Sequence, residues 1–220
     1  MSDNQVITED NIPNKHELQH SWTIYEQVQF SDKKDTNQAY FDSYENICTF
    51  KTAELFWLNW TKLPTVSEMF YEGVEKEIVR IDLTGDNSVE KRYKILGQSI
   101  FKDNILPQYE DVNNKDGGHV QVTFKNDAHK LLGSFWEYVV LSMIGETLED
   151  GNEITGARIL DKSNPEKKFV SYRLEVWFRD YSNQTIKDTL KNRLQLICQK
   201  LKIHQDDIKI KDHNMDFSRK

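Results

Sequence analysis

Cysteines and long apolar runs are both scarce in this sequence. Cys48 and Cys198 are the only cysteines among 220 residues, and both lie inside apolar segments. This placement favours small buried side chains in a reducing compartment over a disulfide framework. The longest apolar run, near residues 136–144, is too short to span a bilayer, and the N-terminal residues lack the basic and apolar regions of a signal peptide. We therefore expect a soluble intracellular protein without a membrane partner.

Sequence signatures of phosphate-binding loops and of metal sites built from histidine and cysteine are also missing. The sequence contains neither standard glycine-rich phosphate loop, and its six histidines are scattered, so we expect none of them to pair with a cysteine or another histidine as metal ligands. We therefore expect no metal and no cofactor.

The charge balance is acidic. Asp and Glu number 36 against 29 Lys and Arg, which gives a formal net charge of -7 and a pI near 5.4. A chain of this charge repels polyanions at long range, which argues against non-specific binding along a nucleic-acid backbone but allows a local basic patch. Five Trp, nine Tyr and eleven Phe are present, several of them in polar surroundings where aromatic rings form stacking platforms.

Strand and helix patterns alternate between two polar ends. Residues 1–15 and 211–220 are polar and non-periodic, which predicts disordered tails around one domain at residues 16–210. Apolar alternation predicts strands, and apolar residues at helical spacing predict helices, the first with Thr52 as its N-cap. The expected strands cover 21–30, 118–124 and 169–180, and the expected helices cover 52–63, 130–148 and 183–201.

The expected strand at 169–180 has two distinct faces. Apolar residues line one face, which suits packing on helices, whereas Arg173 and Trp177 stand on the other, which we expect to be polar and exposed. This pattern predicts an α+β fold, in which about three helices cover the convex face of a curved antiparallel sheet.

A highly charged segment separates the first helix from the rest. Residues 64–98 contain the turn sequence LTGDNS and suit a short helix and a hairpin. We interpret the segment as a long surface insertion in the domain.

Five segments follow one another along the chain: HELQHSWTIY, YFDSYENICTFKTAELFWLNW, IFKDNILPQYEDVNNKDGG, SFWEYVVLSMIGE and EITGARI. Together they resemble the eukaryotic translation initiation factor 4E family, whose members bind the 7-methylguanosine cap of messenger RNA. The resemblance runs from about residue 16 to the end of the third helix and is interrupted at 64–98. It implies a non-catalytic protein with a curved sheet backed by three helices.

The resemblance also implies a site for the cap base. In the family, two aromatic rings sandwich the guanine, and a glutamate beside one ring reads it; these positions match Tyr40, Tyr109 and Glu110. Phe41 and Tyr44 are the alternatives to Tyr40 if the register shifts. The methylated base is cationic, so ring faces attract it more than plain guanine, and a carboxylate accepts two hydrogen bonds from the guanine edge. Tyrosines replace the family's usual tryptophans, which predicts weaker cap binding or an altered preference among methylated caps.

Further residues of the implied cap site come from three other segments. A tryptophan near the methyl group matches Trp177, and basic residues for the cap phosphates match Lys162 and Arg173. Lys167 and Lys168 are alternatives to Lys162. His119 stands where the family has a basic residue, so phosphate binding loses a contact or becomes pH-dependent.

A second surface implied by the resemblance binds partner proteins. Family members bind scaffold or repressor proteins that carry a Tyr-x-x-x-x-Leu-hydrophobic helix, and the matching positions here are His16, Trp57, Leu141 and Gly145. Glu17 replaces the family's proline, so the usual partner helix is expected to fit poorly.

Three functions remain open on the sequence alone. The first is cap binding in translation initiation, in the cytoplasm with the nucleus as a second compartment. The second is a member with weak or lost cap binding that acts as a repressor or competitor through its partners. The third is an enzyme acting on nucleotides with Glu110 and His119 as acid and base, which we disfavour because no nucleophile, metal set or phosphate loop accompanies them.

Overall fold

The computed structural model describes residues 15–30, 44–82, 89–125, 130–149, 152–203 and 208–214. Tyr40 and its alternative Phe41 therefore lie outside the described residues, as do residues 1–14 of the expected N-terminal tail.

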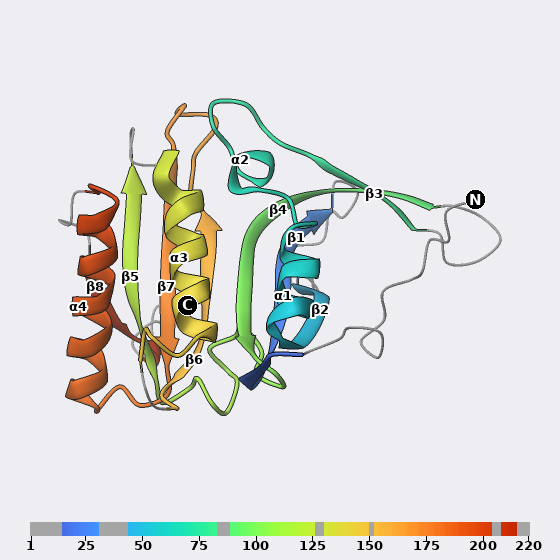
Figure 1. Cartoon of the computed structure of the whole chain (residues 1–220). Helices are drawn as coiled ribbons and strands as arrows, with labels where there is room; N and C mark the ends of the chain where they lie inside the picture. Colours follow the sequence, from blue (N-terminus) through green and yellow to red (C-terminus); the bar gives the residue numbers. More distant parts are fainter. Residues whose placement is uncertain are drawn as a thin grey trace.

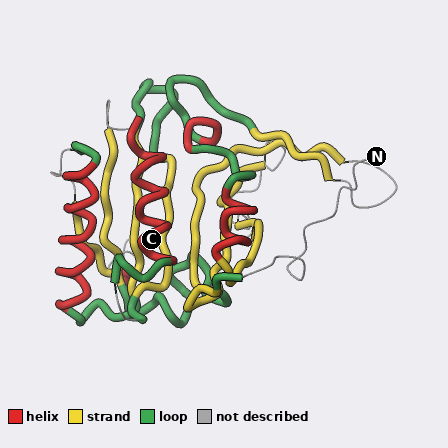
Figure 2. Tube along the Cα trace, in the orientation of Figure 1, coloured by secondary structure: helices red, strands yellow, loops and turns green. Residues whose placement is uncertain are grey.

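Within the described residues, eight antiparallel strands form one curved sheet (Figure 1). The strand order is β2, β1, β4, β6, β7, β5, β8, and β3 pairs with β4 in a hairpin that extends past α1 (Figure 2). The strands are β1 (Glu17–Phe30), β2 (Tyr44–Thr52), β3 (Ile78–Asp82), β4 (Val89–Lys102), β5 (Gly118–Lys125), β6 (Ile154–Asp161), β7 (Ser171–Phe178) and β8 (Ile208–Asp212).

The helices of the described part all cover one face of this sheet (Figure 1). They are α1 (Ala53–Trp60), α2 (Val66–Met69), α3 (Leu132–Ile144) and α4 (Gln184–Lys200). Side-chain caps set two of the starts, since Thr52 accepts a hydrogen bond from the Leu55 amide at 3.3 Å and Asn183 accepts one from the Ile186 amide at 3.2 Å. The predicted α+β architecture is confirmed, with the four-residue α2 added to the three expected helices. In this part of the chain no helix is long and apolar enough to cross a membrane.

Both faces of β7 are buried, which corrects the expectation of an exposed polar face. Tyr172, Leu174 and Val176 pack into the main core beneath the helices, as the alternation predicts. On the opposite face, however, Glu175 and Trp177 are each 0% exposed. Trp177 packs in a second, smaller apolar cluster, and Glu175 pairs with Arg173, whose side chain is 29% exposed.

The charged segment 64–98 is not a surface insertion throughout. It does contain a short helix and one strand pair, α2 and the β3–β4 hairpin. Its Phe70, Tyr93 and Ile95 are nevertheless buried in the main core, and β4 lies between β1 and β6 in the sheet. Alternating charged residues hide this strand in the sequence, because only every second side chain faces the core.

The residues expected as a C-terminal tail begin inside the fold. Asp212 ends β8, which pairs with β5, and the next residue, His213, is 0% exposed. The expectation of a disordered tail from residue 211 is therefore wrong for 211–214, and 215–220 lie outside the described residues.

Candidate functional site

Two parallel aromatic rings mark the face of the sheet opposite the helices. The ring of Tyr109 stacks on that of Trp177, with centroids 4.7 Å apart and planes 9° apart. Trp177 in turn meets Phe101 edge to face at 5.4 Å. Stacking buries Trp177 completely, whereas Tyr109 is half-buried. Tyr109 thus presents to a ligand only the ring face that points away from Trp177.

The loop that carries Tyr109 is fixed by its own side chains. The Asp111 carboxylate accepts hydrogen bonds from the backbone amides of Leu106 at 2.9 Å and Asn113 at 2.8 Å. The Asn114 amide group donates to the backbone oxygens of Leu106 at 2.9 Å and Gln108 at 3.0 Å. The Asp111 carboxylate is therefore engaged in hydrogen bonds to the backbone, whereas Glu110, directly before it, is exposed. This arrangement holds a ring and an exposed carboxylate side by side.

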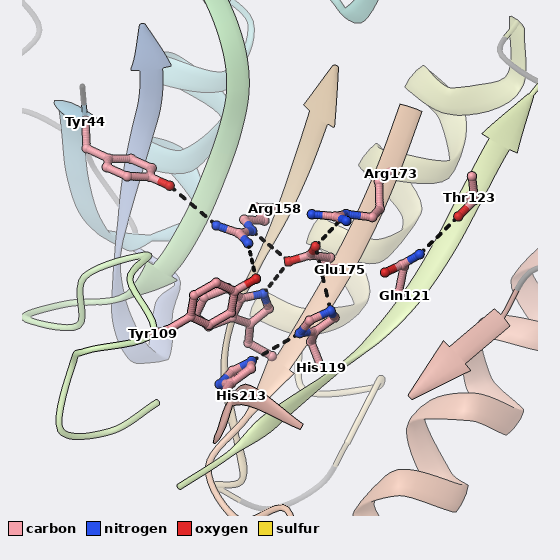
Figure 3. Close-up of polar contacts among 10 residues, drawn as sticks. Tyr44, Tyr109, His119, Gln121, Thr123, Arg158, Arg173, Glu175 and His213 are labelled. Atoms are coloured by element: carbon pink, nitrogen blue, oxygen red, sulfur yellow. Dashed lines mark hydrogen bonds and ion pairs between the residues drawn. The ribbon is translucent and has the colours of Figure 1, made fainter. Parts of the chain in front are cut away.

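A buried ion cluster lies beside the two rings (Figure 3). Arg158 Nε lies 2.7 Å from Glu175 Oε2, and Arg173 Nε lies 2.7 Å from Glu175 Oε1. The indole N–H of Trp177 donates to Glu175 Oε2 at 2.8 Å. Burial alone would raise the pKa of Glu175, but the Arg158, His119 and Arg173 charges outweigh it and hold the pKa well below its ordinary value. Glu175 therefore stays ionised in the folded protein.

Arg158 connects this cluster to two tyrosines. Its Nη2 donates to the Tyr109 hydroxyl at 2.8 Å, and its Nη1 donates to the Tyr44 hydroxyl at 3.4 Å. Its guanidinium carbon lies 4.5 Å from the ring centroid of Trp177 and 5.2 Å from that of Tyr109. The side chain is thus held in place by an ion pair, hydrogen bonds and cation–π contacts.

Two buried histidines complete the cluster. His119 Nε2 lies 3.7 Å from Glu175 Oε1, and His119 Nδ1 lies 3.1 Å from His213 Nε2. His213 Nδ1 lies 2.7 Å from the backbone oxygen of Asn114, and its ring packs against Trp177 and Tyr109 with centroids 4.4 and 4.8 Å away. His119 is 1% exposed. Its expected role as a surface phosphate contact is therefore not supported, because its ring is covered and engaged by Glu175 and His213.

The expected phosphate ligands lie near the ion cluster. Arg173 is 29% exposed and pairs with Glu175, while Lys162 at the end of β6 is exposed. Desolvation, followed by the positive charges of Arg173 and Arg158, lowers the pKa of Lys162. Lys162 and Arg173 thus share one positive field next to the rings. The alternatives Lys167 and Lys168 are exposed in the β6–β7 connection.

Of the cap-site positions expected from the sequence, the structure brings together Tyr109, Trp177 and His119, with Glu110 next to them and Arg173 linked through Glu175. Sequence reasoning missed Arg158, Glu175 and His213. Glu175 had a visible signal, because it lies between Arg173 and Trp177 on the same strand face. Arg158 and His213 had none, since one stands in an apolar run and the other in a polar end.

The expected partner-binding residues lie on the helical side. Trp57 on α1 is 43% exposed, although its ring also meets Phe56 at 5.0 Å. His16 Nδ1, just before β1, lies 2.6 Å from Oε1 of Glu54, which belongs to α1. Leu141 is half-buried on α3, and Gly145 is exposed at its C-cap. An exposed tryptophan of this kind is available to a partner, which a core residue is not.

Residues His16-Glu17-Leu18-Gln19-His20 have the spacing of a zinc-binding helix. Here residues from Glu17 onward belong to β1, in which residues four apart are separated by roughly 13 Å. His16 contacts Glu54, whereas His20 lies 3.3 Å from Glu146, so the two histidines do not converge on one ion. No group of three possible metal ligands occurs among the described residues.

A family model described as Eukaryotic initiation factor 4E matches residues 86–220, more than half of the chain. The chain belongs to this family. It is 27% identical to eukaryotic translation initiation factor 4E of Candida albicans over 190 residues, which cover 84% of this chain and 74% of that protein. It is 30% identical to factor 4E-2 of Schizosaccharomyces pombe over 172 residues, 78% of this chain and 57% of that protein. With factor 4E1 of Drosophila melanogaster it shares 28% identity over 172 residues, 77% of this chain but only 52% of that protein. The chain thus spans about half to three-quarters of these relatives.

Solved structures of other 4E proteins share the fold. Caenorhabditis elegans eIF4E-3, in a complex with the 4E-binding protein Mextli, matches with a TM-score of 0.66 and 22% identity over 94% of this chain and 97% of that chain. Ascaris suum eIF4E-3, in a complex with the m7G cap, matches with a TM-score of 0.65 and 23% identity over 91% of this chain and 92% of that chain.

Proposed function

We propose that this 4E protein binds the 7-methylguanosine cap of messenger RNA in translation initiation, without chemical turnover. The observation that carries the proposal is the fixed loop that presents the Tyr109 ring next to the exposed Glu110 carboxylate. Family membership supports it, and so does the shared fold with Ascaris suum eIF4E-3, which was solved with the m7G cap.

In the proposed complex each part of the cap meets a different group. The base stacks on the face of Tyr109 that points away from Trp177, an interaction worth about 1–3 kcal/mol for a base on an aromatic ring. Glu110 accepts two hydrogen bonds from the guanine edge, which adenine does not offer. Arg173 and Lys162 bind the phosphates through charge-assisted hydrogen bonds. Tyr40 supplies the second ring of the sandwich.

The test is a fluorescence titration of the purified chain with 7-methyl-GTP and, separately, with GTP. We expect saturable quenching by 7-methyl-GTP, weaker binding of GTP, and loss of both in Glu110→Ala. Glu137→Ala is the matched control, because Glu137 is also exposed but lies on α3, on the helical side. If wild type binds neither nucleotide, or if Glu110→Ala binds as wild type does, the proposal is wrong.

We also propose that the helical side binds scaffold or repressor proteins through a Tyr-x-x-x-x-Leu-hydrophobic helix. The exposed Trp57 is the anchor of this surface, to which His16, Leu141 on α3 and Gly145 at the C-cap of α3 also belong. The shared fold with Caenorhabditis elegans eIF4E-3, solved with the 4E-binding protein Mextli, supports it.

One observation favours a second function, that of a repressor or competitor with weak cap affinity. Trp177, the residue expected near the methyl group, is covered by Tyr109 and fully buried. In this arrangement the methyl group adds little to the affinity of the site for the cap. Partner-helix binding without measurable 7-methyl-GTP binding would establish the repressor role, whereas binding of both ligands would support the initiation factor.

A further inference from the structure

A cation of the protein itself already contacts the aromatic pair of the proposed cap site. The Arg158 guanidinium lies 4.5 Å from the ring centroid of Trp177 and 5.2 Å from that of Tyr109. In the proposed mode of binding, the positive charge of 7-methylguanine is the property that these ring faces attract. Arg158 is therefore close enough to these rings to influence how much more tightly they bind a charged base than a neutral one.

Arg158 is fixed and permanently charged. The residue is 4% exposed and is held by Glu175 at 2.7 Å, the Tyr109 hydroxyl at 2.8 Å and the Tyr44 hydroxyl at 3.4 Å (Figure 3). Burial would lower its pKa, but Glu175 outweighs burial and the pKa lies above its ordinary value. The side chain thus cannot lose its proton or swing into solvent to make room for a second cation.

The neighbouring charges do not cancel Arg158 completely. Glu175 is the carboxylate at the centre of the cluster, and it pairs with both Arg158 and Arg173. These three side chains together carry one net positive charge, to which His119 adds another when it is protonated. Lys162 lies in the same field, because the charges of Arg173 and Arg158 help to lower its pKa. The net positive charge of this buried cluster attracts phosphates and disfavours a cationic base, in the opposite sense to the exposed Glu110 carboxylate.

We propose that Arg158 is a specificity-determining residue of the cap site, whose charge reduces the preference for 7-methylguanine over unmethylated guanine. The proposal rests on the proposed cap-binding function and adds the electrostatic origin of its base selectivity. It treats Tyr109 and Arg158 as one unit, because the tyrosine hydroxyl accepts the hydrogen bond that orients the guanidinium. A tryptophan at position 109 has no acceptor to offer Arg158.

The test measures the ratio of the GTP and 7-methyl-GTP dissociation constants in variants that change the charge in opposite directions. Arg158→Met removes the cation, and Glu175 keeps Arg173 as its partner, so the ratio is expected to rise about tenfold. Glu175→Gln keeps the shape and the acceptor oxygen but leaves two uncompensated arginines, so the ratio is expected to fall. Urea unfolding shows whether each variant is folded. If one of the two does not fold, the ratio measured in the other tests the proposal.

Two further variants separate charge from structure. Arg158→Lys keeps the charge but loses the fork of hydrogen bonds, so it is expected to weaken both nucleotides equally and leave the ratio unchanged. Arg173→Met removes the same charge from a site that is 29% exposed and is expected to weaken both nucleotides through their phosphates, with a smaller change in ratio.

The outcomes distinguish this proposal from the proposed function. If wild type binds 7-methyl-GTP but the ratio is the same in Arg158→Met and Glu175→Gln, Arg158 is only structural and the proposal is overturned while cap binding stands. A fall of the ratio in Arg158→Met overturns it as well. If wild type binds neither nucleotide, the proposed function itself fails, and the role of Arg158 fails with it.

Discussion

His213 and Asn114, 99 residues apart in the sequence, meet through a 2.7 Å contact between the His213 Nδ1 atom and the Asn114 backbone oxygen. Because a carbonyl oxygen only accepts hydrogen bonds, His213 Nδ1 carries a proton and donates it. Asn114 in turn fixes the loop that presents Tyr109 and Glu110. His213, near the end of the described chain, therefore stabilises the loop of the proposed cap site through Asn114.

His213→Ala is expected to lower the free energy of unfolding by about 3 kcal/mol. The substitution leaves a cavity among Trp177 and Tyr109 and removes the donor from a buried carbonyl. Urea unfolding at pH 7 measures the change. Lys211→Ala is the control, because Lys211 is exposed on β8 and its loss is expected to change stability by less than about 0.5 kcal/mol. Equal stability of the two variants would show that residue 213 belongs to a loose tail after all.

Acid is expected to destabilise the protein through His213. Burial, assisted by the His119 and Arg158 charges and opposed by the Asn114 carbonyl, lowers the pKa of His213 to about 4 from an ordinary value of 6.5. Between these two pH values the unfolded chain binds a proton that the folded chain does not. Stability is therefore complete above pH 6.5 and is lost as the pH falls, by about 2 kcal/mol at pH 5.

The measurement is the free energy of unfolding at pH 7.0 and 5.0, for wild type and for His213→Asn, which cannot be protonated. The variant is expected to lose less stability than wild type over this interval. Glu175 does not contribute there, since its lowered pKa affects stability only below its ordinary value of 4.5. A pH dependence that is the same in both proteins would assign the effect to other groups.

Local patterns in the sequence predicted the helices α1, α3 and α4 and the strands β1, β5 and β7, but not the strands β2, β6 and β8 or the centre of the site. The helix at α4 follows from apolar residues at helical spacing, and the alternation of β7 follows from period two, because both signals depend only on neighbours in the chain. Arg158 and His213 were missed for the opposite reason. Their burial depends on partners 17 and 99 residues away, Glu175 and Asn114, which no local pattern reveals.

The sequence analysis did not recognise strand β4, and the reason is a different one. Its sequence alternates charged residues with Tyr93 and Ile95, which reads as a surface segment when the positions of the neighbouring strands are unknown. In the structure β4 pairs with β1 along one edge, and along the other edge with β3 at residues 89–93 and with β6 at residues 97–101, so this strand lies inside the sheet. The positions of Tyr40 and of the base reader Glu110 relative to a cap stay predictions that the titrations above test.

Tyr109→Trp is expected to destabilise the protein although tryptophan is the usual residue of the family at this position. The indole has no oxygen to accept the hydrogen bond from Arg158, and its larger ring has to pack beside His213 and Trp177, which both contact Tyr109. An unsatisfied N–H on a buried guanidinium costs about 1–3 kcal/mol. Urea unfolding measures the loss, with Tyr109→Phe as the control that removes only the hydroxyl. A gain of stability in Tyr109→Trp would contradict the coupling between Tyr109 and Arg158.

Asp111→Ala is expected to weaken 7-methyl-GTP binding about tenfold without removing a group that touches the base. Two backbone amides, those of Leu106 and Asn113, lose their acceptor, so the loop is no longer held in the binding conformation before the ligand arrives. The same variant is expected to lose about 2 kcal/mol of stability. Glu110→Ala is the matched comparison, since it removes an exposed carboxylate and leaves stability unchanged while it abolishes recognition of guanine. Unchanged binding in Asp111→Ala would mean that the loop needs no such support.

Trp57→Ala separates the two proposed surfaces. The side chain is 43% exposed on α1, which packs on the main core, whereas Tyr109 packs on the separate smaller cluster that contains Trp177. The loss of Trp57 is therefore expected to reduce binding of a Tyr-x-x-x-x-Leu-hydrophobic peptide by at least about thirtyfold and to leave 7-methyl-GTP binding unchanged. Calorimetry with the peptide and fluorescence with the nucleotide measure the two effects. Leu196→Ala is the control, because Leu196 is 54% exposed on α4, outside the proposed partner surface. If Trp57→Ala weakens the nucleotide as much as the peptide, the two surfaces are coupled through the sheet and cannot be treated as independent sites.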